Sequence, residues 1–120
     1  MDMKFRAWDK NHELMNYIDD LYWFENNGVH NFGGNGTYTD YDIMLYSGMN
    51  DSKRTDEFPL GRKVYENDII KDLDENIYEV IFLNGMFLAR PISEDITLDH
   101  LTSVLASGAY VVGNIYEGEI

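Results

Sequence analysis

The stretch from Ile77 to Arg90 decides the fold: Ile-Tyr-Glu-Val-Ile-Phe-Leu, then Asn84-Gly85, then Met-Phe-Leu-Ala-Arg. Asn-Gly between two apolar runs is the strongest short-range signal for a β-hairpin. Successive side chains of a strand point to opposite faces, and both sets are apolar here. We therefore expect the hairpin to lie centrally in a sheet and to be covered on both sides. The two sets are Tyr78, Val80 and Phe82 on one face, and Ile81 and Leu83 on the other.

Further strands are expected on both sides of this hairpin. Residues 37 to 46 alternate, with Tyr41, Ile43 and Leu45 on one face, which we expect to be the buried one. Residues 110 to 116 predict the last strand, and Gly113-Asn114 within it can form a bulge.

One helix is expected between residues 97 and 108. Thr97 suits the N-cap, and Gly108 can end the helix in the left-handed conformation. Strands with one short helix before a final strand indicate a mostly β fold, a small barrel or sandwich capped by the helix. The apolar face of this helix would carry Leu98, Leu101, Val104 and Leu105.

The length of 120 residues predicts a single domain over residues 1–120. We expect a β-rich N-terminal half over about 1–50, a connecting loop over about 51–63 that contains Pro59 and Gly61, and a barrel-like half over about 64–120. The chain has no cysteine, which excludes disulfides and thiolate chemistry. It has no apolar run that fits a signal peptide or a membrane span, so we expect a cytoplasmic protein that does not enter a membrane.

Charge is the strongest compositional signal. The net charge is -13, and residues 1–60 and 61–120 each hold eleven Asp or Glu, against five and four Lys or Arg. Because nucleic-acid affinity depends on Lys and Arg that displace counterions, direct nucleic-acid binding is not expected. The functional interpretation is an acidic surface for a partner protein with a basic surface, and the structural interpretation is solubility.

The sequence contains no complete catalytic or metal-binding motif. Asp72, Asp74 and Asn76 resemble the start of a calcium loop, but Ile77 stands where glycine is required. A looser divalent site from Asp68, Asp72, Asp74 and Glu75 is the alternative to a solvated turn. No phosphate loop, nucleophile elbow or histidine pair is found, so no catalytic, metal-binding or cofactor-binding residue is assigned, and no cofactor is expected.

Two groups of residues are candidates for partner binding. The first is the consecutive aromatic cluster Tyr22, Trp23 and Phe24, which strand alternation cannot bury completely; it predicts exposure or a second subunit. The second is the acidic group Asp72, Asp74 and Glu75.

Four blocks of sequence resemble the YopX-like proteins of phages and prophages: residues 4–10 (Lys-Phe-Arg-Ala-Trp-Asp-Lys), 44–51 (Met-Leu-Tyr-Ser-Gly-Met-Asn-Asp), 64–70 (Val-Tyr-Glu-Asn-Asp-Ile-Ile) and 112–117 (Val-Gly-Asn-Ile-Tyr-Glu). The resemblance implies a β-rich protein whose C-terminal half is similar to a Src-homology-3 barrel, and it implies no particular activity. The chain departs from the family at Asn67, where glycine is common and where Asn tolerates the left-handed region. It departs again at residues 52–63, which form a longer loop than usual.

Three classes of function follow. The leading hypothesis is a phage or prophage accessory protein that binds a host or phage protein in the bacterial cytoplasm, without catalysis. Its sharper form is an acidic inhibitor that mimics nucleic acid and blocks a host defence or nucleic-acid enzyme. The alternatives are a divalent-metal-dependent enzyme and a self-assembling structural component, the second of which would be a homo-oligomer.

Overall fold

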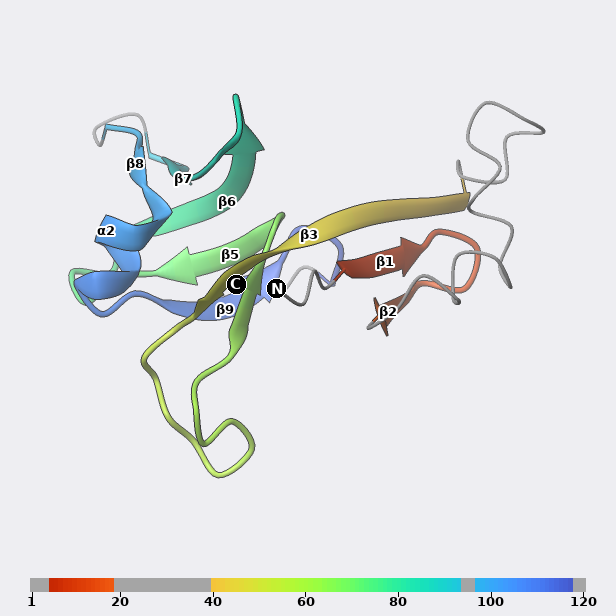
Figure 1. Cartoon of the computed structure of the whole chain (residues 1–120), viewed down its shortest axis with the longest axis horizontal. Coiled ribbons are helices and arrows are strands. Elements are labelled where there is room, and N and C mark those ends of the chain that lie inside the picture. Colours follow the sequence, from red (N-terminus) through yellow and green to blue (C-terminus); the bar gives the residue numbers. More distant parts are fainter. Residues whose placement is uncertain (1–4, 19–39, 94–96, 118–120) are drawn as a thin grey trace. The chain divides into compact units, whose positions relative to one another are not determined.

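The computed structural model describes residues 5–18, 40–93 and 97–117 (Figure 1). Its contacts divide the chain into two compact units, residues 1–46 and residues 47–120. The described residues are mostly strands with one short helix, so the predicted fold class is confirmed. The division of a single domain at about residues 51–63 stays a prediction, as does the likeness of the second half to a Src-homology-3 barrel.

The first unit is built on antiparallel pairing around β1 (Phe5–Asp9). β1 lies between β2 (Leu14–Ile18) and β3 (Tyr41–Asn50). Ala7 at the centre of β1 is fully buried. At the end of the strand the Asp9 carboxylate accepts hydrogen bonds from the backbone N–H groups of the next turn, as expected for an Asx turn.

The third strand differs from its prediction. β3 runs on to Asn50, into the second unit, and residues 37–39 of the predicted strand lie outside the described residues. The most buried side chain of β3 is Met44, on the face opposite the predicted one, and its sulfur accepts a hydrogen bond from Arg6 Nε at 3.3 Å. Alternation alone identifies two faces, and the elements that pack on the sheet decide which one is buried.

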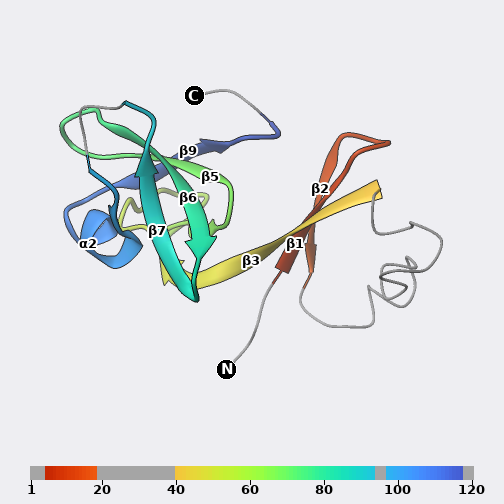
Figure 2. The ribbon, with the colours of Figure 1, turned by 90° about the horizontal axis from the view of Figure 1, so that it is seen from above.

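The second unit contains a curled antiparallel sheet (Figure 2). Its hydrogen-bonded order within the described residues is β8-β7-β6-β5-β9. A short strand, β4, is the neighbour of β3. The strands of this unit are β4 (Lys63–Tyr65), β5 (Asp68–Lys71), β6 (Ile77–Leu83), β7 (Met86–Pro91), β8 (Asp99–His100) and β9 (Tyr110–Asn114).

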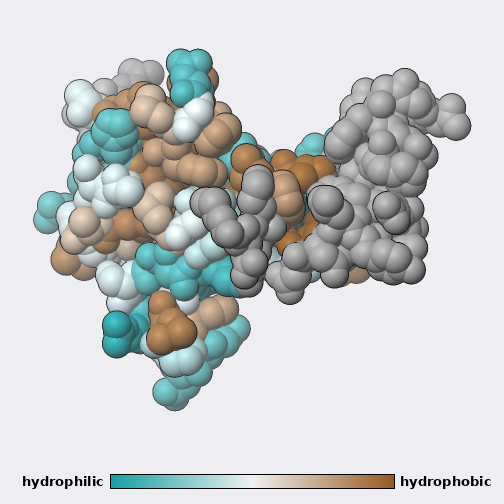
Figure 3. Space-filling model, in the orientation of Figure 1, coloured by the Kyte–Doolittle hydropathy of each residue, from teal (hydrophilic) through white to brown (hydrophobic). Residues whose placement is uncertain are grey.

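The hairpin predicted from the Asn-Gly pair is β6–β7. Asn84 and Gly85 have φ of 52° and 78°, which is the pair of positive values that a type I′ turn requires. The hairpin is central in the sheet, as predicted, but its end is not covered on both sides. Phe82 is exposed near the tip, on the face of Val80 and Ala89 that belongs to the core, and Leu83 and Met86 are exposed on the opposite face. Figure 3 shows apolar surface over β6 just below the tip of the hairpin.

The predicted helix is α2 (Leu101–Ala106), and its start was predicted wrongly. Thr97 is not the N-cap: the helix begins after His100, and the residues before it form β8. Gly108 ends the helical segment with φ of 104°, as predicted. Leu98 lies outside the helix and is exposed. The residues of the predicted apolar face that do pack into the core are Leu101, Val104 and Leu105.

The core of the second unit lies between α2 and the concave face of the sheet. Its buried residues are Val64, Ile70, Tyr78, Val80, Ala89, Leu101, Val104, Leu105, Ala109 and Val111. α2 has six residues, and no helix in the described parts of the chain is long and apolar enough to span a membrane.

Candidate functional site

The turn between β5 and β6, residues 72–76, contains the predicted acidic group. Asp72 organises it: Oδ1 accepts hydrogen bonds from the backbone N–H groups of Asp74 and Asn76, both at 2.9 Å. Oδ2 accepts from Asn76 Nδ2 and from the Tyr78 hydroxyl, both at 3.0 Å. Because each oxygen accepts two hydrogen bonds, three from the turn itself and one from Tyr78 in β6, Asp72 serves to hold the turn in place.

The same contacts shift two pKa values. Burial alone would raise the pKa of Asp72, but the hydrogen bonds from Asn76, Tyr78 and the Asp74 amide outweigh it, so the pKa lies below its ordinary value. The pKa of Tyr78 is raised, first by burial and then by its hydrogen bond to the Asp72 carboxylate. At neutral pH the pair therefore consists of a carboxylate and a neutral phenol, which favours the hydrogen bond between them.

The other two predicted acids point outward. Asp74 and Glu75 are exposed, and Glu75 Oε1 lies 3.7 Å from Lys71 Nζ. Leu73 between Asp72 and Asp74 is 73% exposed, although one edge of it lies against Gly108 beyond α2. The turn thus presents an apolar side chain beside two carboxylates.

Asp68 does not join this group. It is 1% exposed, and its Oδ2 accepts a hydrogen bond from the Tyr65 backbone N–H at 2.8 Å, so it caps a backbone group of the β4–β5 turn. Among residues 5–18, 40–93 and 97–117, no group of three or more His, Asp or Glu side chains is placed to hold a metal ion. The looser divalent site of the sequence analysis therefore has no geometric support in this part of the chain.

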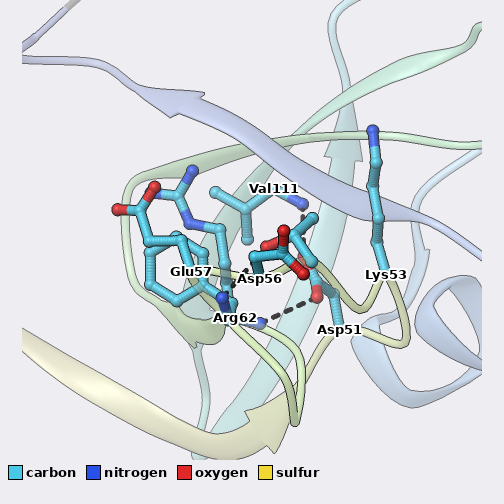
Figure 4. Close-up of a pocket in the computed structure, with 8 residues that line it drawn as sticks. Asp51, Lys53, Asp56, Glu57, Arg62 and Val111 are labelled. Carbon is cyan, nitrogen blue, oxygen red and sulfur yellow. Dashed lines mark hydrogen bonds between the residues drawn. The ribbon is translucent and has the colours of Figure 1, made fainter.

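A second structured region, the loop of residues 51–62 between β3 and β4, is built in a similar way around Asp51 (Figure 4). Asp51 is 4% exposed. Its Oδ1 accepts from the Arg62 backbone N–H and its Oδ2 accepts from the Val111 backbone N–H, both at 2.9 Å. The Asp51 N–H donates to the Arg62 carbonyl at 2.9 Å, which closes the base of the loop. One carboxylate thus joins the end of β3, the start of β4 and the edge strand β9.

The rest of the loop is fixed by short-range contacts. Phe58 N–H donates to Thr55 Oγ1 at 3.0 Å, and Gly61 N–H donates to the Phe58 carbonyl at 3.0 Å. Gly61 has φ of 85°, and a Cβ there would overlap the Asp51 carbonyl oxygen, so this position requires glycine.

An open hollow of about 400 Å³ lies beside this loop. Figure 4 shows Lys53 on one side of it and Arg62 with Glu57 on the other. The hollow is lined by Asp51, Lys53, Thr55, Asp56, Glu57, Phe58, Arg62 and Val111.

The aromatic candidates Tyr22, Trp23 and Phe24 lie outside the described residues, so their role stays a prediction. The role of Asp51 and the charged hollow that it lines were not predicted from the sequence. An aspartate that ends a strand and a glycine ten positions later give a local signal for a closed loop, but the bond to Val111 joins residues 60 positions apart. No local pattern reveals that contact.

A family model described as YopX protein matches residues 4–119. The chain belongs to the YopX family. A solved structure, the crystal structure of protein EF1440 from Enterococcus faecalis, has a TM-score of 0.55 and 20% identity to the chain, over 96% of this chain and 94% of that one. At that identity the likeness concerns the fold. No curated protein matches the chain.

The four YopX blocks contain polar side chains that bind backbone N–H groups, and we call such a side chain a staple. Asp51 ends the second block and Asp68 lies in the third, and both carboxylates bind backbone N–H groups. In the fourth block, Asn114 Oδ1 accepts from the N–H groups of Tyr116 and Glu117 at 3.0 and 2.8 Å.

Asn67 has φ of 68°, in agreement with the prediction that it replaces a family glycine in the left-handed region. Pairing across β5 and β9 jumps from Gly113 to Val111, a bulge near the position expected. These polar residues of YopX maintain the fold, and the exposed side chains between them are the candidates for function.

Proposed function

We propose that this YopX protein is a phage or prophage accessory protein that binds a protein with a basic surface in the bacterial host cytoplasm, without catalysis. One observation carries the proposal: the Asp72 carboxylate fixes the β5–β6 turn from inside, so that Leu73, Asp74 and Glu75 are held outward. A preformed turn loses little conformational entropy on binding.

The composition of the turn suits a protein partner. An exposed leucine provides an apolar contact, and the neighbouring carboxylates provide charge complementarity and guide the encounter with a basic surface. The net charge of -13 acts in the same direction over a longer range.

The proposal is tested by capture of host proteins with the tagged chain at low and at high salt. Wild type is compared with Asp74→Asn/Glu75→Gln, and the matched control is Glu13→Gln/Glu117→Gln, which removes the same charge from exposed side chains outside the turn. We expect one dominant partner with a basic surface, released by high salt, and captured roughly tenfold less by the first variant alone.

Equal capture by the two variants would refute the role of the turn. Capture that resists salt and is lost in Trp23→Ala would assign binding to the aromatic cluster instead. The narrower hypothesis of an inhibitor that mimics nucleic acid adds one expectation: a DNA duplex should compete with the chain for the captured partner.

A further inference from the structure

The part of the loop after the buried Asp51, taken together with Lys63 at the start of β4, differs in charge from the chain as a whole. Residues 53–63 contain four Lys or Arg and two Asp or Glu, of the 9 and 22 in the chain. The remainder therefore holds five positive and twenty negative side chains. Residues 53–63 are therefore net positive within a strongly acidic protein.

The cations of this loop lie near Asp56 and Glu57 but form no ion pair with them. Within the described residues, Lys53, Arg54 and Arg62 form no ion pair. Two of them rest on aromatic rings instead: Lys53 Nζ lies 4.1 Å from the Tyr110 ring centroid, and the Arg62 guanidinium carbon lies 4.9 Å from that of Phe58. A cation–π contact orients a cation and leaves its charge unpaired. Such oriented cations can form ion pairs with the carboxylates of a partner molecule.

The loop also has the composition of a protein interface. Leu60 is 78% exposed, the highest value among the exposed large apolar side chains of the described residues. Figure 3 shows a separate apolar area over this loop, with hydrophilic surface around it. An apolar contact within a charged rim is the usual anatomy of a binding surface, and the Asp51 staple holds it in one conformation.

We propose that loop 51–62 is a second protein-binding surface, which accepts an acidic segment of a partner protein together with an apolar pocket for Leu60. Asp56 and Glu57 are exposed among the cations. These carboxylates would repel the closely and regularly spaced phosphates of a nucleic acid. A polypeptide can instead place positive side chains opposite them and negative side chains opposite the cations. This surface is independent of the acidic turn, and its partner has the opposite charge.

Site-specific crosslinking tests the proposal. Because the chain has no cysteine, Leu60→Cys and Leu73→Cys each provide a single attachment point for a photoreactive crosslinker. Both full-length variants are irradiated in a nuclease-treated lysate of the bacterial host, and the crosslinked peptides are sequenced by mass spectrometry. We expect the Leu60→Cys adduct to contain a peptide with an excess of Asp and Glu. Its yield should fall about tenfold when Lys53→Glu/Arg54→Glu is added, and should persist with Glu13→Gln/Glu117→Gln, which changes exposed acids outside the loop.

Four outcomes would overturn the proposal: a basic peptide at Leu60→Cys, a peptide from a second copy of this chain, an adduct with nucleic acid when nuclease is omitted, or no adduct. Thermal unfolding of each variant controls for folding. The Leu73→Cys adduct separates this proposal from the proposed function, because charge reversal at Lys53 and Arg54 should leave its yield unchanged.

Discussion

The acidic turn 72–76 and the loop 51–62 are both organised by a central aspartate, and they differ in which residues that carboxylate contacts. Asp72 binds donors no more than six residues away, whereas Asp51 binds donors 11 and 60 residues away. Each contains an exposed leucine and charged side chains, which are negative in the turn and of both signs in the loop. Local contacts such as those of Asp72 stabilise one turn, and their loss should cost the whole fold little. Long-range contacts such as those of Asp51 also join separate strands of the sheet.

The largest difference in unfolding free energy is expected between alanine substitutions at two glycines. These are Gly61 in the loop and Gly108 next to the turn. Both have positive φ, of 85° and 104°. A Cβ at Gly61 meets the Asp51 backbone, which cannot move without opening the loop, whereas a Cβ at Gly108 meets the flexible Leu73 side chain. Gly61→Ala should therefore lower the free energy of unfolding by about 3 kcal/mol or more, and Gly108→Ala by about 1 to 2 kcal/mol. Urea unfolding of the two variants measures this difference, and equal losses would mean that the loop backbone adjusts freely.

The two carboxylates themselves give the next comparison. Asp51→Asn places an NH₂ group against a buried backbone N–H and should cost about 2 to 3 kcal/mol of unfolding free energy. Asp72→Asn affects a partly exposed turn whose groups can bind water, so about 1 kcal/mol is expected. Thermal unfolding with both variants at pH 7 gives the ranking. A larger loss for Asp72→Asn would contradict the distinction between long-range and local staples.

A smaller effect isolates one contact of the turn. Tyr78→Phe removes the hydroxyl that donates to Asp72 Oδ2 and keeps the buried ring. We expect a loss of about 0.5 to 1.5 kcal/mol. In the Asp72→Asn background the same change should cost less, because the charged acceptor is gone; additive losses in this double-mutant cycle would show that the two groups are uncoupled.

The acid dependence of stability gives the smallest effect. The pKa of Asp72 is lowered in the folded protein, so the unfolded chain takes up the proton first as pH falls. The stabilisation is complete above the unfolded pKa of about 3.8 and is lost as pH falls through the lower folded value. Wild type and Asp72→Asn should therefore differ at pH 6 and converge towards pH 2 in unfolding experiments. A gap that stays constant over this range would exclude the charge of Asp72 as its source.

Local sequence reasoning succeeded where a single residue type or pair sets the backbone. Asn84-Gly85 predicted the hairpin, Gly108 the end of α2 and Asn67 a left-handed residue, and each prediction is confirmed. It failed at Thr97, because β8 takes up residues before the helix, and at the hairpin tip, where Leu83 and Met86 are exposed on the face opposite the core. Of the candidate site, the exposed acids Asp74 and Glu75 were named from sequence, but the cationic loop was not.

The sequence by itself determined that the protein is mostly β, strongly acidic, free of cysteine and similar to the YopX family, because turn residues, alternation and composition are local properties. Only the tertiary structure decided that Asp51 is buried under the loop, that Lys53 rests on Tyr110, and that Leu60 and Leu73 face outward. These features depend on pairs of residues far apart in the chain, whose meeting is set by the packing of the sheet and by no local pattern.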